Sequence, residues 1–308
     1  MPDDAEPPPS ELPPEIAEVV EAVRRATDRD LHGYRGSTLS AAIHRRVGRL
    51  QATSAAAYAV RLRDDPAEAN LLLGALRPRV PRLFRELPAL HAAAQGLRED
   101  RRRRGGFEAT RAWIPGCGTG EEAYSLAALL LDPGPFAGHG DTLQVLATDL
   151  GAHALDAARA GLYPADAFTD VPPERLVPLF VPEGEGYRVS RALRAAVTFL
   201  EHDVLSDPPF TGLDLLSCRT LLLYLTPDAR RRALSIFHHA LREGGLLLLG
   251  AADTLDPREL LLFEPVASRW RLFRRRRAAH TPPPGQDEGQ AAPDESQLAN
   301  QELADMTE

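Results

Sequence analysis

The chain has 308 residues, 44% of them hydrophobic, and a formal net charge of -8. This length predicts two domains or one large domain, and the apolar share is ordinary for a protein with a hydrophobic core. Residues 1–11 contribute -4 and residues 281–308 contribute -7, which leaves +3 for the body of the chain. A body so weakly basic argues against a nucleic-acid binder that relies on bulk charge.

Cysteine content and hydropathy bear on the compartment. The 2 cysteines are too few for a disulfide framework, which favours a reducing environment. No apolar run approaches the ~18 residues of a membrane span. The N-terminus lacks the basic-then-apolar pattern of a signal peptide. We therefore expect a cytoplasmic protein that does not insert into a membrane.

The N-terminal third of the chain has a helical pattern. Residues 1–11 are rich in proline and acids, and we expect them to be disordered, as we do the acidic tail of residues 280–308. From residue 12, apolar side chains recur at helical spacing, as at Ile16, Val19, Val20 and Val23. We expect an all-helical N-terminal domain over residues 12–100, followed by an arginine-rich linker at residues 101–106.

Strands and helices alternate from residue 107 onward. Apolar strand-like runs cover residues 143–148, 196–200, 213–216, 246–249 and 270–273, with helical patterns at residues 152–160 and 227–241. This alternation predicts an α/β fold with a mostly parallel, doubly wound, Rossmann-like sheet within residues 101–279. Ligands of such sheets bind at the carboxyl ends of the strands.

A glycine-rich loop follows the first apolar run of this region. Gly116, Gly118 and Gly120 precede the acidic pair Glu121-Glu122 and a helical pattern. Glycines let backbone approach a ligand closely. A dinucleotide fingerprint has its third glycine where this chain has Glu121, and an acid there would oppose a pyrophosphate. The loop therefore favours a cationic, amine-bearing ligand such as S-adenosylmethionine (SAM), with a plain glycine turn as the alternative.

A series of motifs spans residues 12–276. In chain order it includes Gly33-Tyr34-Arg35, Leu83-Phe84-Arg85, the glycine loop through Leu126, Ala147-Thr148-Asp149, the segment 207–210 and the segment 213–219. The series resembles the chemotaxis receptor methyltransferase (CheR) family of SAM-dependent protein-glutamate O-methyltransferases. The resemblance implies SAM as cofactor, a SAM-methyltransferase sheet with an N-terminal all-helical domain, and a small antiparallel β insertion at about residues 180–200.

The resemblance also implies the site residues. It places Arg85, Arg219 and Tyr224 at the reaction centre. A glutamate carboxylate, with a reference pKa of ~4.3, is already ionised and needs no general base, and an arginine fork can hold it. The implied cofactor-binding set, with no metal, is Pro81, Gly116, Cys117, Gly118, Gly120, Glu121, Asp149, Asp203, Val204 and Thr220. Asp149 would accept both ribose hydroxyls, and its alternative role is that of a helix N-cap.

Several positions depart from the family pattern. Arg79 and Pro81 stand where Asn and Thr are usual, Asp203 and Thr220 each stand for Asn, and Ala252-Asp253 stands for Ser-Glu. Asp203 still offers an acceptor to the adenine amine, whereas Pro81 loses a hydroxyl and an N–H. These changes motivate an alternative function, a catalytically impaired module that binds SAM or S-adenosylhomocysteine (SAH) and acts as a signalling scaffold.

The expected partner is the helical cytoplasmic domain of a chemoreceptor, which carries the glutamates. The helix at residues 38–51 offers Arg45, Arg46 and Arg49 as a basic docking face, with a solvated helix face as the alternative. This face is thinner than is usual in the family, so a non-receptor carboxylate substrate stays open. We expect a monomer. Cys117 and Cys218 are interpreted as inert buried thiols, with a redox-sensitive pair as the alternative.

Overall fold

The computed structural model of the protein describes residues 12–77, 82–105, 109–131, 143–169 and 179–277. The chain divides into two units, residues 1–276 and 277–308, and the elements below belong to the first. The terminal segments predicted to be disordered, residues 1–11 and 280–308, lie outside the described residues. None of the described helices combines the length and apolarity that a membrane span requires.

Four helices form the N-terminal part: α1 (Pro14–Thr27), α2 (Gly36–Leu50), α3 (Ala55–Asp64) and α4 (Pro66–Ala75). The apolar stripe predicted for α1 is buried, with Ile16, Val19 and Val23 at most 1% exposed. Two caps stop the helices from fraying: Ser54 Oγ accepts from the Ala57 N–H, and the Asp65 carboxylate accepts from the Glu68 N–H. The prediction of an N-terminal helical domain is confirmed.

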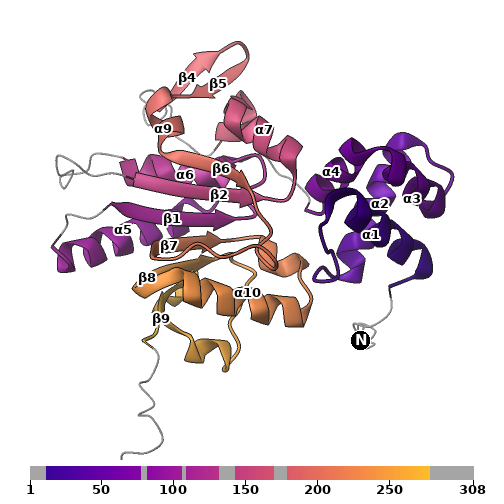
Figure 1. Ribbon diagram of the computed structural model, residues 1–308. Coiled ribbons are helices and arrows are strands. Elements are labelled where there is room, and N and C mark those ends of the chain that lie inside the picture. Colours follow the sequence, from indigo (N-terminus) through magenta and orange to yellow (C-terminus); the bar gives the residue numbers. More distant parts are fainter. Residues whose placement is uncertain (1–11, 78–81, 106–108, 132–142, 170–178, 278–308) are drawn as a thin grey trace, which may run out of the picture. The chain divides into compact units, whose positions relative to one another are not determined.

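Seven strands form the main sheet, in the order β6-β2-β1-β7-β8-β10-β9 (Figure 1). Their bounds are β1 (Thr110–Pro115), β2 (Leu143–Asp149), β6 (Val197–Glu201), β7 (Leu213–Cys218), β8 (Leu241–Leu249), β9 (Phe263–Ala267) and β10 (Leu272–Arg275). The first five in this order pair in parallel, and β10 pairs antiparallel with both β8 and β9. The prediction of a mostly parallel, doubly wound sheet is confirmed, and the strand order reverses at β1, where such sheets bind ligands.

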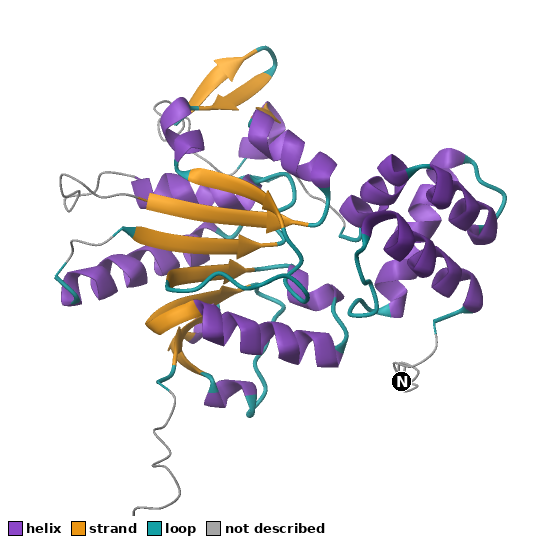
Figure 2. Ribbon diagram, in the orientation of Figure 1, coloured by secondary structure: helices purple, strands orange, loops and turns teal. Residues whose placement is uncertain are grey.

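Helices cover both faces of this sheet (Figure 2). Because side chains alternate along a strand, Ala112 and Ile114 of β1 share one core with α5 (Leu87–Arg103), α6 (Glu121–Leu131) and α7 (Ala152–Ala160). Trp113 faces the other core, which contains α10 (Pro227–Ala240). The short 3-10 helices are η1 (Ala165–Phe168), η2 (Leu221–Tyr224), η3 (Glu259–Leu261) and η4 (Ser268–Trp270).

Helix α5 lies within the predicted helical domain of residues 12–100 but packs against the sheet. It contacts β7, β8, β10 and α6, and its buried face shares their core. Its last turn also contains Arg101 to Arg103, the first half of the predicted linker. The helix therefore belongs to the sheet layers because its apolar stripe, centred on Leu90 and Ala94, is buried there.

The antiparallel insertion differs in extent from the prediction of about residues 180–200. It is a three-stranded sheet of order β3-β5-β4, with β3 (Leu162–Pro164), β4 (Phe180–Glu183) and β5 (Gly186–Val189). Residues after Ser190 leave it for α9 (Arg191–Ala195) and β6. The reason is the alternation in β6, where Val197 and Phe199 point into the core of the main sheet.

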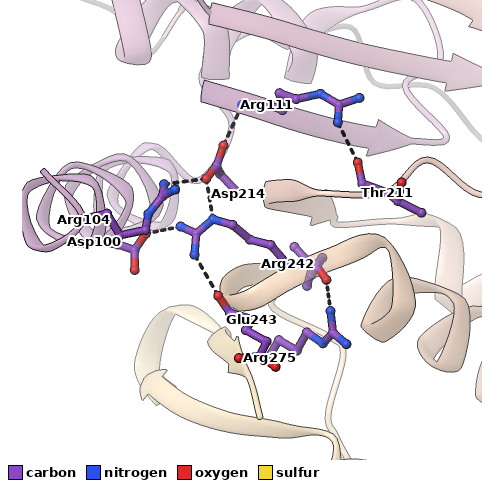
Figure 3. Close-up of polar contacts among 9 residues, drawn as sticks. Asp100, Arg104, Arg111, Thr211, Asp214, Arg242, Glu243 and Arg275 are labelled. Atoms are coloured by element: carbon purple, nitrogen blue, oxygen red, sulfur yellow. Dashed lines mark hydrogen bonds and ion pairs between the residues drawn. The ribbon is translucent and has the colours of Figure 1, made fainter. Parts of the chain in front are cut away.

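A polar network joins α5, β1, β7 and β8 at the amino ends of the strands (Figure 3). Its centre is Asp214, which is 4% exposed. Asp214 Oδ1 accepts from Arg104 at 2.7 Å and from Arg242 at 2.6 Å, and Oδ2 accepts from the Arg111 N–H at 2.8 Å. The Asp100 carboxylate forms ion pairs with the side chains of Arg104 and Arg242. The buried carboxylate thus anchors the crossover from α5 into the sheet.

We expect Asp214→Ala to lower the free energy of unfolding by about 3 kcal/mol, because the Arg111 N–H and two guanidinium groups lose their most buried acceptor and Asp100 alone remains to pair with both arginines. Urea unfolding measures the change. The matched control is Asp228→Ala, whose carboxylate is 81% exposed and pairs with Arg231, and which should cost well under ~1 kcal/mol. Equal losses in the two variants would refute the structural role of Asp214.

Candidate functional site

The glycine loop begins where β1 ends, and its glycines have different tasks. Gly116, Gly118 and Gly120 have φ of 71°, 59° and 91°, in the left-handed region that favours glycine. A Cβ on Gly118 would meet nothing within 4 Å, so this residue faces open space. A Cβ on Gly120 would lie 2.9 Å from Ala158 Cβ and 3.0 Å from Tyr163 Oη. Gly120, predicted to bind cofactor, thus serves the close packing of the loop on α7.

Two adjacent cavities lie at the carboxyl ends of β1, β2 and β7. The larger has a volume of about 110 Å³, and the smaller of about 20 Å³. The predicted site residues that line the larger one are Arg85, Gly116, Cys117, Gly118, Glu121, Arg219 and Thr220. Those that line the smaller one are Gly116, Asp149, Asp203 and Val204. The fold therefore brings most of the predicted set together.

Asp149 ends β2 beside the glycine loop and is 5% exposed. Its Oδ1 accepts from the Gly151 N–H at 3.0 Å, and its Oδ2 accepts from the Gly118 N–H at 2.8 Å and from Arg77. The N-cap of α7 is Gly151, without a side-chain cap hydrogen bond, so the capping alternative for Asp149 is wrong. The carboxylate instead joins the ends of β1 and β2.

Arg77 lines both cavities and was not predicted to be a site residue. It donates to the Gly116 carbonyl at 2.5 Å, to Thr220 Oγ1 at 3.5 Å and to Asp149 Oδ2. Burial, the largest influence, lowers the pKa of Arg77, but the charge of Asp149 together with those of Tyr34, Cys117 and Cys218 outweighs it, and the net shift is upward. In the sequence, Arg77 follows the apolar run at the end of α4, and no pattern in that segment predicts that it pairs with Asp149.

Arg219 follows β7, and its side chain is 5% exposed. One terminal nitrogen donates to the Arg85 carbonyl at 2.6 Å and to Glu86 Oε2 at 3.1 Å. Its Nε has no hydrogen-bond partner within the part of the chain that the structure describes. A buried, charged donor of this kind is suited to an anionic ligand. The Arg85 side chain is 52% exposed and lies 3.8 Å from Glu86, nearer to solvent.

The acidic pair at the start of α6 also borders the larger cavity. Glu121 Oε1 accepts from Thr119 Oγ1 at 2.5 Å, and Glu122 Oε1 accepts from Ser217 Oγ at 2.5 Å. Glu122 and Glu86 were not among the predicted site residues. The acidic pair itself was visible in the sequence, but the contact of Glu122 with β7 depends on the sheet order.

Among the described residues, two of those predicted for the cofactor site and reaction centre, Gly120 and Tyr224, line neither cavity. Tyr224 is partly buried in η2 and lines neither of the two cavities described above; its backbone carbonyl accepts from the Arg35 N–H at 2.9 Å. Pro81 and its neighbour Arg79 lie outside the described residues. Of the three residues predicted for the reaction centre, Arg85 and Arg219 line the larger cavity.

Of the three arginines predicted to form the basic face of α2, one is buried and two are exposed. Arg46 is 8% exposed and makes a two-pronged ion pair with Glu68 at 2.8 and 2.6 Å, so its prediction as a substrate contact is wrong. The reason is its spacing, which puts it on the face of Leu39 and Ile43 that packs into the helical core. Arg45 and Arg49 are exposed, and Arg45 donates to the Ala75 carbonyl at 2.7 Å.

The two cysteines are free and buried. Burial raises the pKa of the Cys117 thiol and also that of Cys218. Because the thiolate is the reactive form, both groups have the character of inert thiols. This supports the interpretation as core residues over a redox-sensitive pair.

Asp253 follows β8 and is 2% exposed, and its Oδ2 accepts from the Gly250 N–H at 3.2 Å. Burial raises its pKa to about 6, although Arg230 and the Gly250 N–H oppose the shift. The pKa of Asp253 in the folded protein exceeds its unfolded value. The stability that the protonated carboxyl contributes is therefore fully present below pH ~4 and is lost as the pH rises through 6.

We therefore expect Asp253→Asn to raise the melting temperature at pH 8, by the equivalent of about 1 kcal/mol, and to change it little at pH 4. Calorimetry at the two pH values tests this, with the exposed Asp166→Asn as control. A gain that is independent of pH would contradict the assignment.

The arrangement fits a nucleoside with a charged amino-acid end. Gly118 leaves open space, Asp149 offers carboxylate oxygens, and Glu121 offers an acceptor for an amine. The sheet is mostly parallel, one acid follows the glycine loop, and another ends β2. Together with the strand order, these features define the class of Rossmann-like SAM-dependent methyltransferase domains.

The comparison with protein families identifies the branch of this class. Residues 79–272 match the CheR methyltransferase, SAM binding domain, and residues 14–76 match the CheR methyltransferase, all-alpha domain. The chain belongs to the CheR methyltransferase family, and its cofactor is SAM.

Curated relatives are similar over different shares of their length. Chemotaxis protein methyltransferase 2 of Pseudomonas aeruginosa is 28% identical over 246 residues, 78% of this chain and 86% of that protein. A chemotaxis protein methyltransferase of Listeria innocua is 32% identical over 145 residues, 47% of this chain and 54% of that protein. The "Uncharacterized 104.1 kDa protein in hypE 3'region" of Rhodobacter capsulatus is 33% identical over 241 residues, 78% of this chain and only 25% of that protein.

Proposed function

We propose that this protein methylates glutamate side chains on the helical cytoplasmic domain of a chemoreceptor, with SAM as methyl donor, in a chemosensory pathway. The observation that carries the proposal is the place of Arg219. Its buried guanidinium lines the cavity that the open glycine loop also lines, and its Nε has no partner among the described residues. A carboxylate is the acceptor that such a donor suits best.

SAM, when bound, supplies an electrophilic methyl group. The residues of the chain have two tasks around it, to hold the cofactor and to orient an incoming carboxylate. Asp149 would accept from the ribose hydroxyls and Glu121 from the amino group, while Asp203 and Val204 border the smaller cavity, on the side toward which the base would lie. This ligand needs no cation-rich phosphate site, which agrees with Glu121 directly after the loop and with Asp149 beside it.

Arg219 and Arg85 would act on the substrate. A glutamate with a pKa of ~4.3 arrives as an anion, so proton removal is unnecessary and alignment dominates the rate. The Arg219 Nε–H would donate to one carboxylate oxygen inside the cavity. Arg85, half exposed, would meet the same anion as it enters from solvent. Arg45 and Arg49 remain the proposed docking contacts on α2.

The test is transfer of labelled methyl groups from SAM to receptor cytoplasmic fragments from the same genome. We expect label that alkali releases, as it does from carboxyl methyl esters, and that disappears when the acceptor glutamates are changed to glutamine. Label that resists alkali would point to another nucleophile. Measured SAM binding without label on any receptor fragment would reject the proposed substrate.

The position of Tyr224 favours a second candidate function. Because this residue lines neither cavity, the protein could bind SAM or SAH without turnover and act as a signalling scaffold. Calorimetric binding of SAM by a protein that methylates nothing supports the scaffold, and any turnover excludes it. The burial of Arg46 in turn favours a smaller or non-receptor carboxylate substrate, because it thins the basic face of α2.

A further inference from the structure

Arg77 occupies the boundary between the two cavities, and its side chain is 15% exposed. It donates to Asp149, to the Gly116 carbonyl and to Thr220 Oγ1, and these three groups follow β2, β1 and β7. A Cβ on Gly116 would lie 2.5 Å from Arg77 Nη1, so the guanidinium rests directly on the glycine loop. A ligand that spans both cavities has to pass this position.

Asp149 has little acceptor capacity left while Arg77 is in place. A carboxylate oxygen offers about two lone pairs. Oδ2 already accepts from the Gly118 N–H and from Arg77, and Oδ1 accepts from the Gly151 N–H. A ribose diol that binds both oxygens requires an acceptor position on each of them. The diol and Arg77 therefore compete for the same oxygen.

The backbone fixes Arg77 at this place. It follows α4 by two residues, and the end of α4 crosses the turn after β2 in close contact. A Cβ on Gly151 would lie 2.7 Å from Gly74 Cα, so the two backbones meet at glycines on both sides. This crossing delivers the Arg77 side chain to Asp149. The desolvated ion pair it forms there is a contact that the cofactor has to replace.

We propose that Arg77 is a built-in competitor of SAM, which is clasped to Asp149 in the free protein and has to leave it before the ribose binds. The inference rests on the proposed role of Asp149 as the ribose acceptor. It has two consequences: the clasp lowers the affinity for SAM, and its release limits the rate at which SAM enters. The clasp also links the end of α4 to cofactor occupancy.

The test is SAM and SAH binding by calorimetry and stopped-flow fluorescence on the full chain. We expect Arg77→Met to bind both ligands ~10-fold more tightly, because a charge-assisted hydrogen bond no longer has to be broken. In the wild type the observed rate should level off with rising SAM concentration, since release precedes binding, and in Arg77→Met it should rise linearly. Arg77→Gln, which keeps neutral donors, should fall between the two. The exposed Arg61→Met is the control and should leave both quantities unchanged.

Unchanged affinity in Arg77→Met and Arg77→Gln, with melting temperatures retained, would overturn the clasp. Weaker binding would also overturn it and would make Arg77 a cofactor ligand. Asp149→Ala in the Arg77→Met background separates the two proposals. If that double variant binds SAM as tightly as Arg77→Met, the role of Asp149 fails. If it binds much more weakly while Arg77→Met shows no gain over wild type, only the clasp fails.

Discussion

Replacement of Asp149 by alanine is expected to weaken SAM binding at least ~100-fold. The carboxylate at the end of β2 is 5% exposed, so a ribose would donate to it in a largely dehydrated place. Two hydrogen bonds to a charged acceptor contribute about 3 kcal/mol or more together, and about 1.4 kcal/mol corresponds to a factor of ten in affinity. Isothermal titration calorimetry on the wild type and Asp149→Ala measures the loss.

The Asp149 variant also loses contacts of the free protein, so its fold needs a separate check. The Gly118 and Gly151 N–H groups would lose their acceptor and would need water in its place, and Arg77 would lose its ion pair. The melting temperature without ligand reports that effect. Asp156→Ala is the matched control, because its carboxylate is 70% exposed on α7 and should not affect SAM binding. A loss of affinity below threefold in a folded Asp149→Ala protein would remove this residue from the cofactor site.

The second large effect is expected at Arg219. We predict that Arg219→Met lowers kcat/KM for a receptor fragment by ~100-fold or more, while the dissociation constant for SAM changes little. The loss corresponds to about 3 kcal/mol for a buried charged donor to a carboxylate. Arg219→Lys should recover only part of the rate, because an ammonium group lacks the planar fork.

Two outcomes would change the role of Arg219. If Arg219→Met loses SAM binding in proportion to activity, the free Nε faces the cofactor carboxylate and not the substrate. If Arg219→Lys restores full activity, the site needs only a positive charge. The exposed Arg63→Met is the control for the removal of one arginine. The melting temperature again matters, because Arg219 also holds the Arg85 carbonyl and Glu86.

The fold was largely predictable because its signals are local. The helix α1 follows from apolar residues at a spacing of 3.6, and a buried strand such as Leu143 to Thr148 follows from a short, nearly continuous apolar run. The extent of α5 and of the insertion was less predictable. Both depend on which core buries an apolar face, and a pattern shows that a face is apolar without showing what covers it.

The candidate site was predictable where a residue type follows a strand. Gly118, Asp149 and Asp203 all lie at carboxyl ends of parallel strands, which meet at one edge of the sheet. The neighbours against which individual residues pack were not predictable. Gly120 packs on α7, Tyr224 lines neither of the two described cavities, and Arg46 turns into the helical core.

The class of this protein could be predicted because the glycine loop, the acid after it and each of the motifs are short, continuous segments of the chain. Which charged side chains pair with one another depends on how distant segments pack. Arg46 and Glu68 are 22 positions apart, and Arg77 and Asp149 are 72 apart. Such pairs form because two helices or a helix and a strand are packed together, and no local pattern encodes that distance. The contact between Arg77 and Asp149 in the candidate cofactor site is such a pair, and it could be found only in the folded structure.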